Sequence, residues 1–329
     1  MRLALFAAAV MTVTNAGYAA DWAVQKVKTS DRVTAVETID GKPRINAGHT
    51  WYQIEITDVQ PTLSVVDAPA RPALPQGALP DGRIATGTRD IVRTWLAEPT
   101  TRYDHGVLGD KIEAGSLMIE TRDGKSHVVR LSPDAVFEDL EPRLADLEGD
   151  GHDEVVLVKT YLKRGSCLAV IGLRNGHYEV LAESQPLGAP HRWLDPAGIA
   201  DFNGDGHVDV ALVRQPHVVG ALELWTWNEG RLRKVSELSD TANHIAGTRA
   251  IHMAAVADFN GDGIADLAVP SLDRTRLRII TFVTGPRELA SVVLPSRAAT
   301  NLAIASTSSG VPAIVVGLAD GSLVVIRRD

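Results

Sequence analysis

Three short segments of the chain carry oxygen-bearing side chains at one shared spacing. Counted from the first aspartate of each segment, positions 1, 3, 5 and 9 hold Asp, Asn or Glu, and position 6 holds glycine, which allows a sharp turn. These side chains are Asp146, Glu148, Asp150, Glu154, Asp201, Asn203, Asp205, Asp209, Asp258, Asn260, Asp262 and Asp266. Alternate side chains of a curled loop point inward, and Ca²⁺ takes about six to eight oxygen ligands. The spacing therefore predicts up to three calcium sites, of which the Glu-containing first is expected to be the loosest.

Two alternatives to this interpretation can be weighed from the sequence. An EF-hand needs a bidentate Glu at position 12, but that position holds Leu157, Leu212 and Val269. A valine-rich strand also follows each loop, where an EF-hand has a helix. Plain polar turns remain the second alternative, although turns do not need acids at positions 1, 3, 5 and 9 together.

The elements that must position these loops repeat as well. Asp146, Asp201 and Asp258 are 55 and 57 residues apart, a period that fits one blade of a β-propeller and not a helical solenoid. Short β-runs joined by turns rich in Gly and Asn lie between the loops, as in a hairpin-linked blade. A fourth copy keeps the strands but has Ser306 and Ser308 in place of the first acids. No metal is expected in that copy.

The run Asp-Phe-Asn-Gly-Asp-Gly before a strand, at residues 201–206 and 258–263, resembles the FG-GAP/VCBS repeat family. The best-known members of that family are the propeller domains of integrin α subunits. The resemblance is clear over residues 140–329 and extends to residues 21–139 only by inference. It implies an all-β propeller in which each loop joins the first two strands of a blade and holds calcium through the side chains named above. It does not fix an activity, since the fold serves adhesion, sugar binding and scaffolding.

The whole of residues 21–329 is expected to form one propeller domain of six blades, with five or seven left open. Two diverged blades are predicted upstream of the loops, over residues 33–66 and 90–140. The segment Pro69–Pro80 between them is expected to be a surface connector, because proline does not fit a central strand. The last blade lacks a fourth strand, and Trp22–Lys28 is predicted to supply it, so that the terminal strands close the ring.

A second site is suggested by arginines in equivalent positions. In three repeats an arginine stands nine residues before loop position 1, at the opposite end of the innermost strand from the metal loop. Such arginines would converge near the propeller axis and could hold a carboxylate or phosphate by bidentate contacts. The residues assigned to this site are Arg192, Arg249, Arg297, His191, Trp193 and His244. The alternative is that the arginines pair with acids of neighbouring blades and the histidines cap loops.

One further connection is rich in functional side chains. The segment Pro99–Asp110, which includes Arg102, Tyr103, Asp104 and His105, is predicted to join the first and second strands of an upstream blade, where it would replace the metal loop. Its side chains could do acid–base chemistry or bind a transition metal. The simpler interpretation is a packed loop that closes the bottom of the propeller.

Composition and termini restrict the class of protein. The first twenty residues join one basic residue, Arg2, to a short apolar run and small residues near Ala19 and Ala20, the pattern of a cleaved secretory signal peptide. No later stretch is long and apolar enough for a membrane span. The single cysteine, Cys167, excludes an internal disulfide and is expected to be buried and inert. A net charge of −8 without a basic stripe argues against nucleic acid as a partner.

We therefore expect a periplasmic or secreted, calcium-binding, non-enzymatic module that recognises a protein, a glycan or a small anionic ligand through its arginine-bearing face. A hydrolase or lyase that uses His105, His191 or His244 is the alternative from another class. A structural scaffold of the cell envelope is the third.

Overall fold

The computed structural model describes residues 22–57 and 60–328, which form an all-β structure with a single 3₁₀ turn, η1 (Gly106–Leu108). The predicted signal peptide and its cleavage near Ala19 and Ala20 lie outside the described residues. No helix in the described part of the chain is long and apolar enough to cross a membrane.

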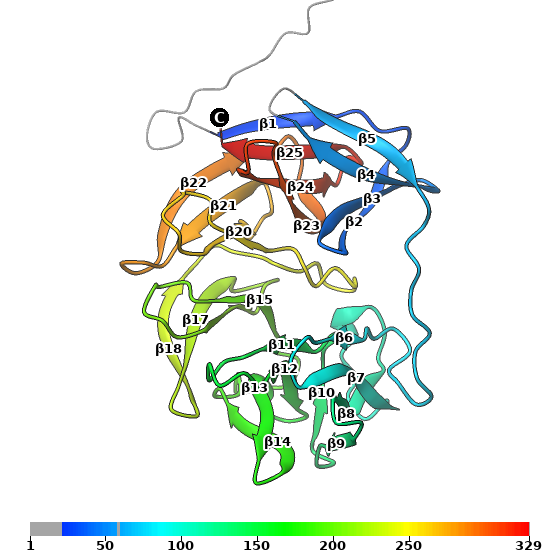
Figure 1. Ribbon diagram of the computed structural model, residues 1–329, viewed down its shortest axis with the longest axis vertical. Helices are drawn as coiled ribbons and strands as arrows, with labels where there is room; N and C mark the ends of the chain where they lie inside the picture. The colour runs from blue at the N-terminus through cyan, green and yellow to red at the C-terminus, as the bar shows by residue number, and fades with distance from the viewer. Residues whose placement is uncertain (1–21, 58–59, 329) are drawn as a thin grey trace, which may run out of the picture.

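Four of the five sheets are four-stranded and antiparallel (Figure 1). The first contains β2 (Val33–Ile39), β3 (Lys42–Ala47), β4 (Thr50–Ile56) and β5 (Pro61–Val66). The next two contain β15 (Leu194–Ala200), β16 (Asp209–Arg214), β17 (Ala221–Asn228) and β18 (Arg231–Leu238), and then β19 (Ala255–Ala257), β20 (Asp266–Pro270), β21 (Arg276–Thr281) and β22 (Arg287–Val293). The fourth joins β23 (Ala298–Ser306), β24 (Pro312–Leu318) and β25 (Leu323–Arg328) to β1 (Trp22–Val27).

The N-terminal strand therefore shares a sheet with the C-terminal one. Strands β1 and β25 are antiparallel, with Trp22 opposite Arg328 and Val27 opposite Leu323. The strand predicted over Trp22–Lys28 and its place beside the last strand are confirmed. This pairing covers the edge that β25 would otherwise expose.

The fifth sheet has nine strands in two groups. One group is β6 (Ala85–Thr86), β7 (Ile91–Thr100), β8 (Glu113–Thr121) and β9 (Ser126–Arg130), and the other is β10 (Ala135–Phe137), β11 (Arg143–Ala145), β12 (Glu154–Tyr161), β13 (Gly165–Arg174) and β14 (His177–Glu183). The two groups meet at β10, where Phe137 lies opposite both Lys159 and Ala114.

Two predictions for this region are wrong. The strand predicted at the end of the upstream blade is instead β10, which with β11 forms the first strand of the next group because both pair with β12. The short strand β6, which pairs with β7, is the first strand of the upstream group. The loop Pro99–Asp110 therefore joins the second and third strands of that group, not the first and second. Alternate loops of a hairpin-linked sheet lie at opposite ends, so this loop lies at the end away from the metal loops.

The sheets follow one another around a central space, the arrangement of a β-propeller (Figure 1). β2 packs beside β23, β23 beside β19, β19 beside β15, and β14 beside β18. Buried Val, Leu and Ile of neighbouring sheets fill the spaces between them, as the alternation of apolar strands requires. Between β5 and β6 the chain runs as an extended segment along one side of the molecule, and the proline-rich part predicted as a connector contains no sheet strand.

Candidate functional site: three acidic loops and a central cavity

The three acidic loops share one backbone conformation. They join β11 to β12, β15 to β16 and β19 to β20, each the first two strands of a group. The glycines at positions 4 and 6 have φ angles between 71° and 88° in all three loops, a region that residues with a side chain rarely adopt. These glycines allow the curl that gathers the acidic side chains.

Hydrogen bonds at equivalent atoms hold the curl. The position 1 carboxylate accepts the position 6 amide at 3.0, 2.9 and 2.8 Å in the three loops in chain order. The position 5 carboxylate accepts the position 7 amide at 2.9 Å in each. The position 9 carboxylate accepts the position 2 amide at 2.9, 3.1 and 3.0 Å. The three loops that the spacing predicts therefore share the same hydrogen-bond geometry.

The position 2 side chains anchor the loops in the core. Leu147, Phe202 and Phe259 are all buried. The rings of Phe202 and Phe282 meet edge to face with their centroids 5.7 Å apart, so the second loop is fixed to the neighbouring sheet. The side chains at positions 1, 3 and 5 lie closer to the surface than this buried residue.

The second and third loops fit Ca²⁺ by the chemistry of their donors. Each offers three carboxylates and an asparagine amide, a hard oxygen set. Oδ1 of Asp266 is buried beside the hydroxyl of Thr281, where it is one of the oxygens that a bound cation would use. Burial raises the pKa of Asp209 and Asp266 to about 6 against the hydrogen bonds that they accept.

The described residues hold no ready-made metal cluster. In the described ranges, no three His, Cys, Asp or Glu side chains are gathered as a set that could hold a metal ion. The loop carboxylates instead accept backbone amides, as described above. A cation bound here would draw on Asn203 or Asn260 and on backbone carbonyls besides the carboxylates.

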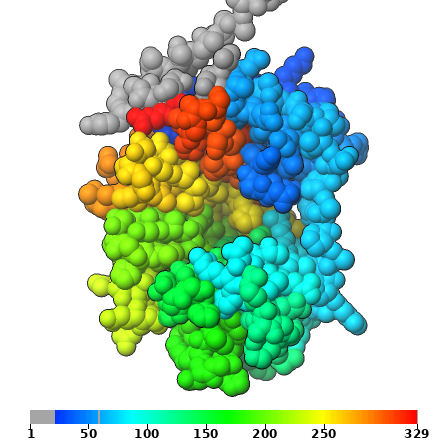
Figure 2. All heavy atoms as spheres, viewed as in Figure 1, coloured from blue at the N-terminus to red at the C-terminus, as the bar shows by residue number. Residues whose placement is uncertain are grey.

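A cavity of about 1330 Å³ opens between the β2–β5 sheet and the segment that leads into β6. Figure 2 shows the surface hollowed between the N-terminal sheet and the upstream part of the nine-stranded sheet. Its walls are the β2–β3 turn, the end of β4, residues of the segment between β5 and β6, and the inner strands β19 and β23. No sequence pattern predicts this cavity, because its walls come from segments up to 271 residues apart, from Glu37 to Ser308.

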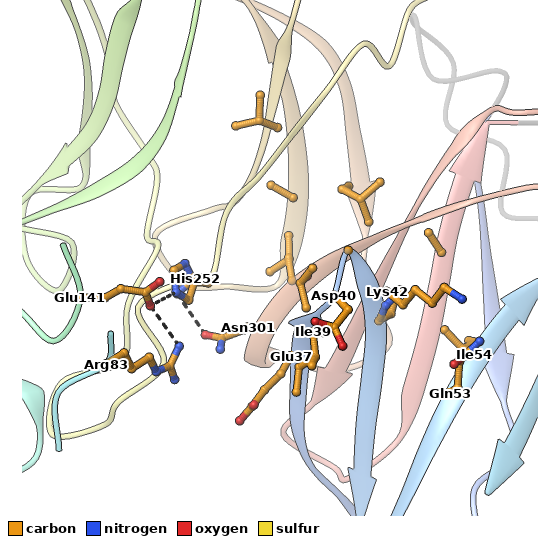
Figure 3. Close-up of a pocket in the computed structure, with 18 of the residues that line it drawn as sticks. Glu37, Ile39, Asp40, Lys42, Gln53, Ile54, Arg83, Glu141, His252 and Asn301 are labelled. Atoms are coloured by element: carbon orange, nitrogen blue, oxygen red, sulfur yellow. Dashed lines mark hydrogen bonds and ion pairs between the residues drawn. The ribbon is translucent and has the colours of Figure 1, made fainter. Parts of the chain in front are cut away.

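One wall of the cavity carries a fixed polar network (Figure 3). Oε2 of Glu141 lies 3.1 Å from Nε2 of His252 and 3.4 Å from Nη1 of Arg83. The backbone amide of His252 donates to Oδ1 of Asn301 at 3.0 Å. Burial alone would raise the pKa of Glu141, but the hydrogen bond to His252 and the nearby arginine charges lower it to about 2. The opposite wall presents Asp40 and other residues of the β2–β3 turn.

The predicted arginines have separate surroundings. All three are exposed and stand just before the first strands of their sheets, as the repeat predicts. Arg249 pairs with Asp81 at 2.9 Å and with Asp110 at 3.2 Å. Nη1 of Arg192 donates to the Leu187 carbonyl at 3.0 Å. None of these arginines is among the described residues that line the cavity.

The aromatic and histidine residues predicted beside them do gather. His191 stacks on His105 with ring centroids 5.0 Å apart, so the loop Pro99–Asp110 meets the predicted ligand face. The buried rings of Trp193 and His244 lie 4.8 Å apart.

Glu138, which the sequence analysis missed, holds this cluster together. It is fully buried, its Oε1 lies 2.5 Å from Nδ1 of His105, and its backbone carbonyl accepts Nε1 of Trp193 at 3.1 Å. Its Oε2 accepts the hydroxyl of Thr160 at 2.6 Å. The signal that could have found it is an acidic residue directly after an apolar strand.

Comparison with known proteins agrees with the repeat. Residues 201–269 match a family model described as FG-GAP-like repeat, which confirms the resemblance to that family over the second and third loops and the strands between them. No curated protein matches the chain. One solved structure that is similar to it is the N-terminal domain of Nup159, with 11% identity over 90% of this chain and 76% of that one and a TM-score of 0.43. The class of protein is therefore assigned from the sheets and loops themselves, which are FG-GAP-like repeats in a β-propeller arrangement.

Proposed function

We propose that this protein is an exported β-propeller of six blades that bound calcium stabilises. It acts as a non-enzymatic binding module and holds its ligand in the central cavity. The six blades are the four four-stranded sheets and the two groups of the nine-stranded sheet. The pairing of β1 with β25 supports closure of the last blade by the terminal strands. The cavity then lies where the β2–β5 and β6–β9 blades would otherwise pack.

The cavity is the observation that carries the binding function. Its volume exceeds the range of roughly 300–1,000 Å³ that is usual for small-molecule sites, which favours a segment of a larger molecule. Among the described residues that line it, the only ring besides proline is the imidazole of His252, so it offers no aromatic platform for a sugar. Its carboxylates outnumber its lysine and arginine side chains. These features favour an extended peptide segment without excess negative charge, from a partner protein.

An array experiment tests this proposal. The mature chain is applied to an array of overlapping peptides and to a glycan array, beside Glu141→Gln and His252→Ala variants. We expect retention on peptides that both variants weaken at least about tenfold, because each variant breaks the network of the cavity wall. His177→Ala, at an exposed hairpin turn, is the matched control and should bind as the wild type does. Retention on glycans alone would contradict the ligand class, and unchanged binding by both cavity variants would contradict the site.

Calcium is tested separately by thermal unfolding. Ligands that bind only the folded state stabilise it by mass action, so EGTA should lower the melting temperature by several degrees and excess Ca²⁺ should restore it. An Asp201→Asn, Asp258→Asn double variant should show a smaller response. A wild-type melting temperature that EGTA leaves unchanged would refute the claim that calcium stabilises the propeller.

Export is tested by expression of the full chain in a bacterial host. We expect the protein in the periplasm or the medium, with an N-terminus near Ala19 or Ala20. Retention of the whole N-terminal segment in the cytoplasm would contradict this part of the proposal.

A second candidate function rests on His105 and Glu138. A buried carboxylate that orients an imidazole is the arrangement of a general base, and His191 stacks on its ring. A hydrolase would use His105 to take a proton from water. Turnover of a panel of esters and glycans that His105→Ala abolishes would favour this candidate, and a flat panel with the wild type would exclude it for those substrates.

A further inference from the structure

The first acidic loop differs from the others in having a cation of the protein at its carboxylates. Arg89, in the connection between β6 and β7, places Nη1 at 2.7 Å from Oδ1 of Asp153 and Nε at 3.6 Å from Oδ2 of Asp146. Asp146 is the position 1 ligand of the loop and Asp153 stands at position 8. The guanidinium group therefore places a positive charge beside the position 1 carboxylate of the first loop.

Asp90, the residue after Arg89, also contacts the first loop. Oδ1 of Asp90 accepts the backbone amide of Asp153 at 2.7 Å. Its Oδ2 accepts the Tyr178 hydroxyl at 2.9 Å and lies 3.4 Å from Nδ1 of His152, the position 7 residue. The connection between β6 and β7 thus fixes the first loop from the neighbouring group of strands without any metal.

The remaining acids of the first loop also face a basic side chain. A small cavity of about 310 Å³ is lined by the acids at positions 3, 5 and 9 and by Arg174. Nη1 of Arg174 lies 3.3 Å from Glu179 across the β13–β14 hairpin. Because Arg174 is paired with Glu179, the charge that acts on the loop carboxylates is that of Arg89, and this charge disfavours a divalent cation.

The second loop has no such partner. Within the described residues, no ion pair joins a lysine or arginine to Asp201, Asp205 or Asp209. At the third loop, Arg328 donates a hydrogen bond of 3.2 Å to the Asn260 carbonyl. The first loop is thus distinguished by the ion pair between Arg89 and its position 1 carboxylate, as well as by its two Glu residues.

We propose that Arg89 is a built-in counter-ion that takes the place of calcium at the first loop, so that the protein loads the second and third loops and leaves the first to its own arginine. This inference rests on the proposed calcium binding, and it names which loops take the ion. Loss of the Arg89 charge converts the first loop into a calcium site, because its carboxylates at positions 1, 3, 5 and 9 are all retained.

Calorimetric titration with CaCl₂ at low salt tests the proposal on the mature chain after EGTA treatment. The wild type should bind two ions, with any third at least about tenfold weaker. In an Asp201→Asn, Asp258→Asn background, which leaves the first loop alone, Arg89→Gln should tighten calcium binding at least about tenfold. Arg89→Lys keeps the charge and is the matched control, and it should bind as the Arg89 parent does.

A second measurement needs no variant. A crystal of the wild type with two equivalents of calcium should show anomalous density at the second and third loops and none at the first. Three equal sites in the wild type, density at the first loop, or an Arg89→Gln variant that binds no tighter would each overturn the role of Arg89 alone. If no calcium binding depends on Asp201 or Asp258, both the proposed stabilisation by calcium and this inference are overturned.

Discussion

Replacement of Phe202 by alanine should destabilise the protein and loosen the second loop together. The Phe202 side chain is fully buried between the β15–β18 and β19–β22 sheets. Its Cζ is 3.2 Å from the place that a Cβ on Gly198 would take, and its ring meets that of Phe282. Little space is left for neighbours to close over the void, so the cost should lie near the middle of the range for Phe→Ala in a core, about 4 kcal/mol.

The assay is equilibrium unfolding in urea, followed by tryptophan fluorescence and circular dichroism, with melting temperature as a second readout. For a chain of this size, about 2 °C per kcal/mol gives a fall of about 8 °C. Loss of the ring leaves the backbone of residue 202 without its anchor, and because its amide donates to Asp209, calcium affinity at the second loop should fall as well. Val293→Ala, at a residue that is 62% exposed on β22, is the control and should cost under about 0.5 kcal/mol. A Phe202→Ala cost below about 1 kcal/mol would refute the claim that this residue anchors the loop in the core.

Three further predictions follow from single sites. Gly198→Ala should cost about 1–3 kcal/mol, because the added Cβ would stand 2.4 Å from a methyl of Val256; a double-mutant cycle with Val256→Ala should recover part of this cost, and independent effects would contradict the contact. The pKa of Glu141, about 2 against an ordinary 4.5, means that the wild type loses stability as the pH falls from about 4.5 towards 2; urea midpoints of Glu141→Gln should be flatter over that window, and identical slopes would count against the His252 pairing. Cys167 is fully buried, and burial raises the pKa of its thiol, so it should react with a thiol reagent only in denaturant; fast reaction of the folded protein would show that the strand is open.

Local regularity explains what could be predicted of this chain. The β-runs follow from apolar alternation and from Gly and Asn in the turns, so strands such as β12 and β16 lie within a few residues of their predicted bounds. The curl of the three loops follows from glycine at fixed positions. In each case the signal lies within about ten residues of sequence, where chain geometry alone decides the outcome.

The upstream region shows where such reasoning fails. The sequence predicts the connection Pro99–Asp110 at the wrong end of its blade, because β6 has only two residues and leaves no pattern in the sequence. Its partner β7 defines it through pairing, which is a tertiary fact. Because β6 is missed, His105 is predicted at the face that carries the metal loops, whereas the structure places it at the opposite face.

By itself, the sequence determined the β class, the repeat, the three acidic loops and the place of the N-terminal strand beside the last one. Only the tertiary structure decided that Arg89 stands at the first loop, that Arg249 is paired with Asp81 and Asp110, and that a cavity opens beside Glu141 and His252. The physical reason is separation along the chain: ligand spacing within a loop is fixed by covalent geometry, whereas charge pairing and cavities depend on how distant sheets pack.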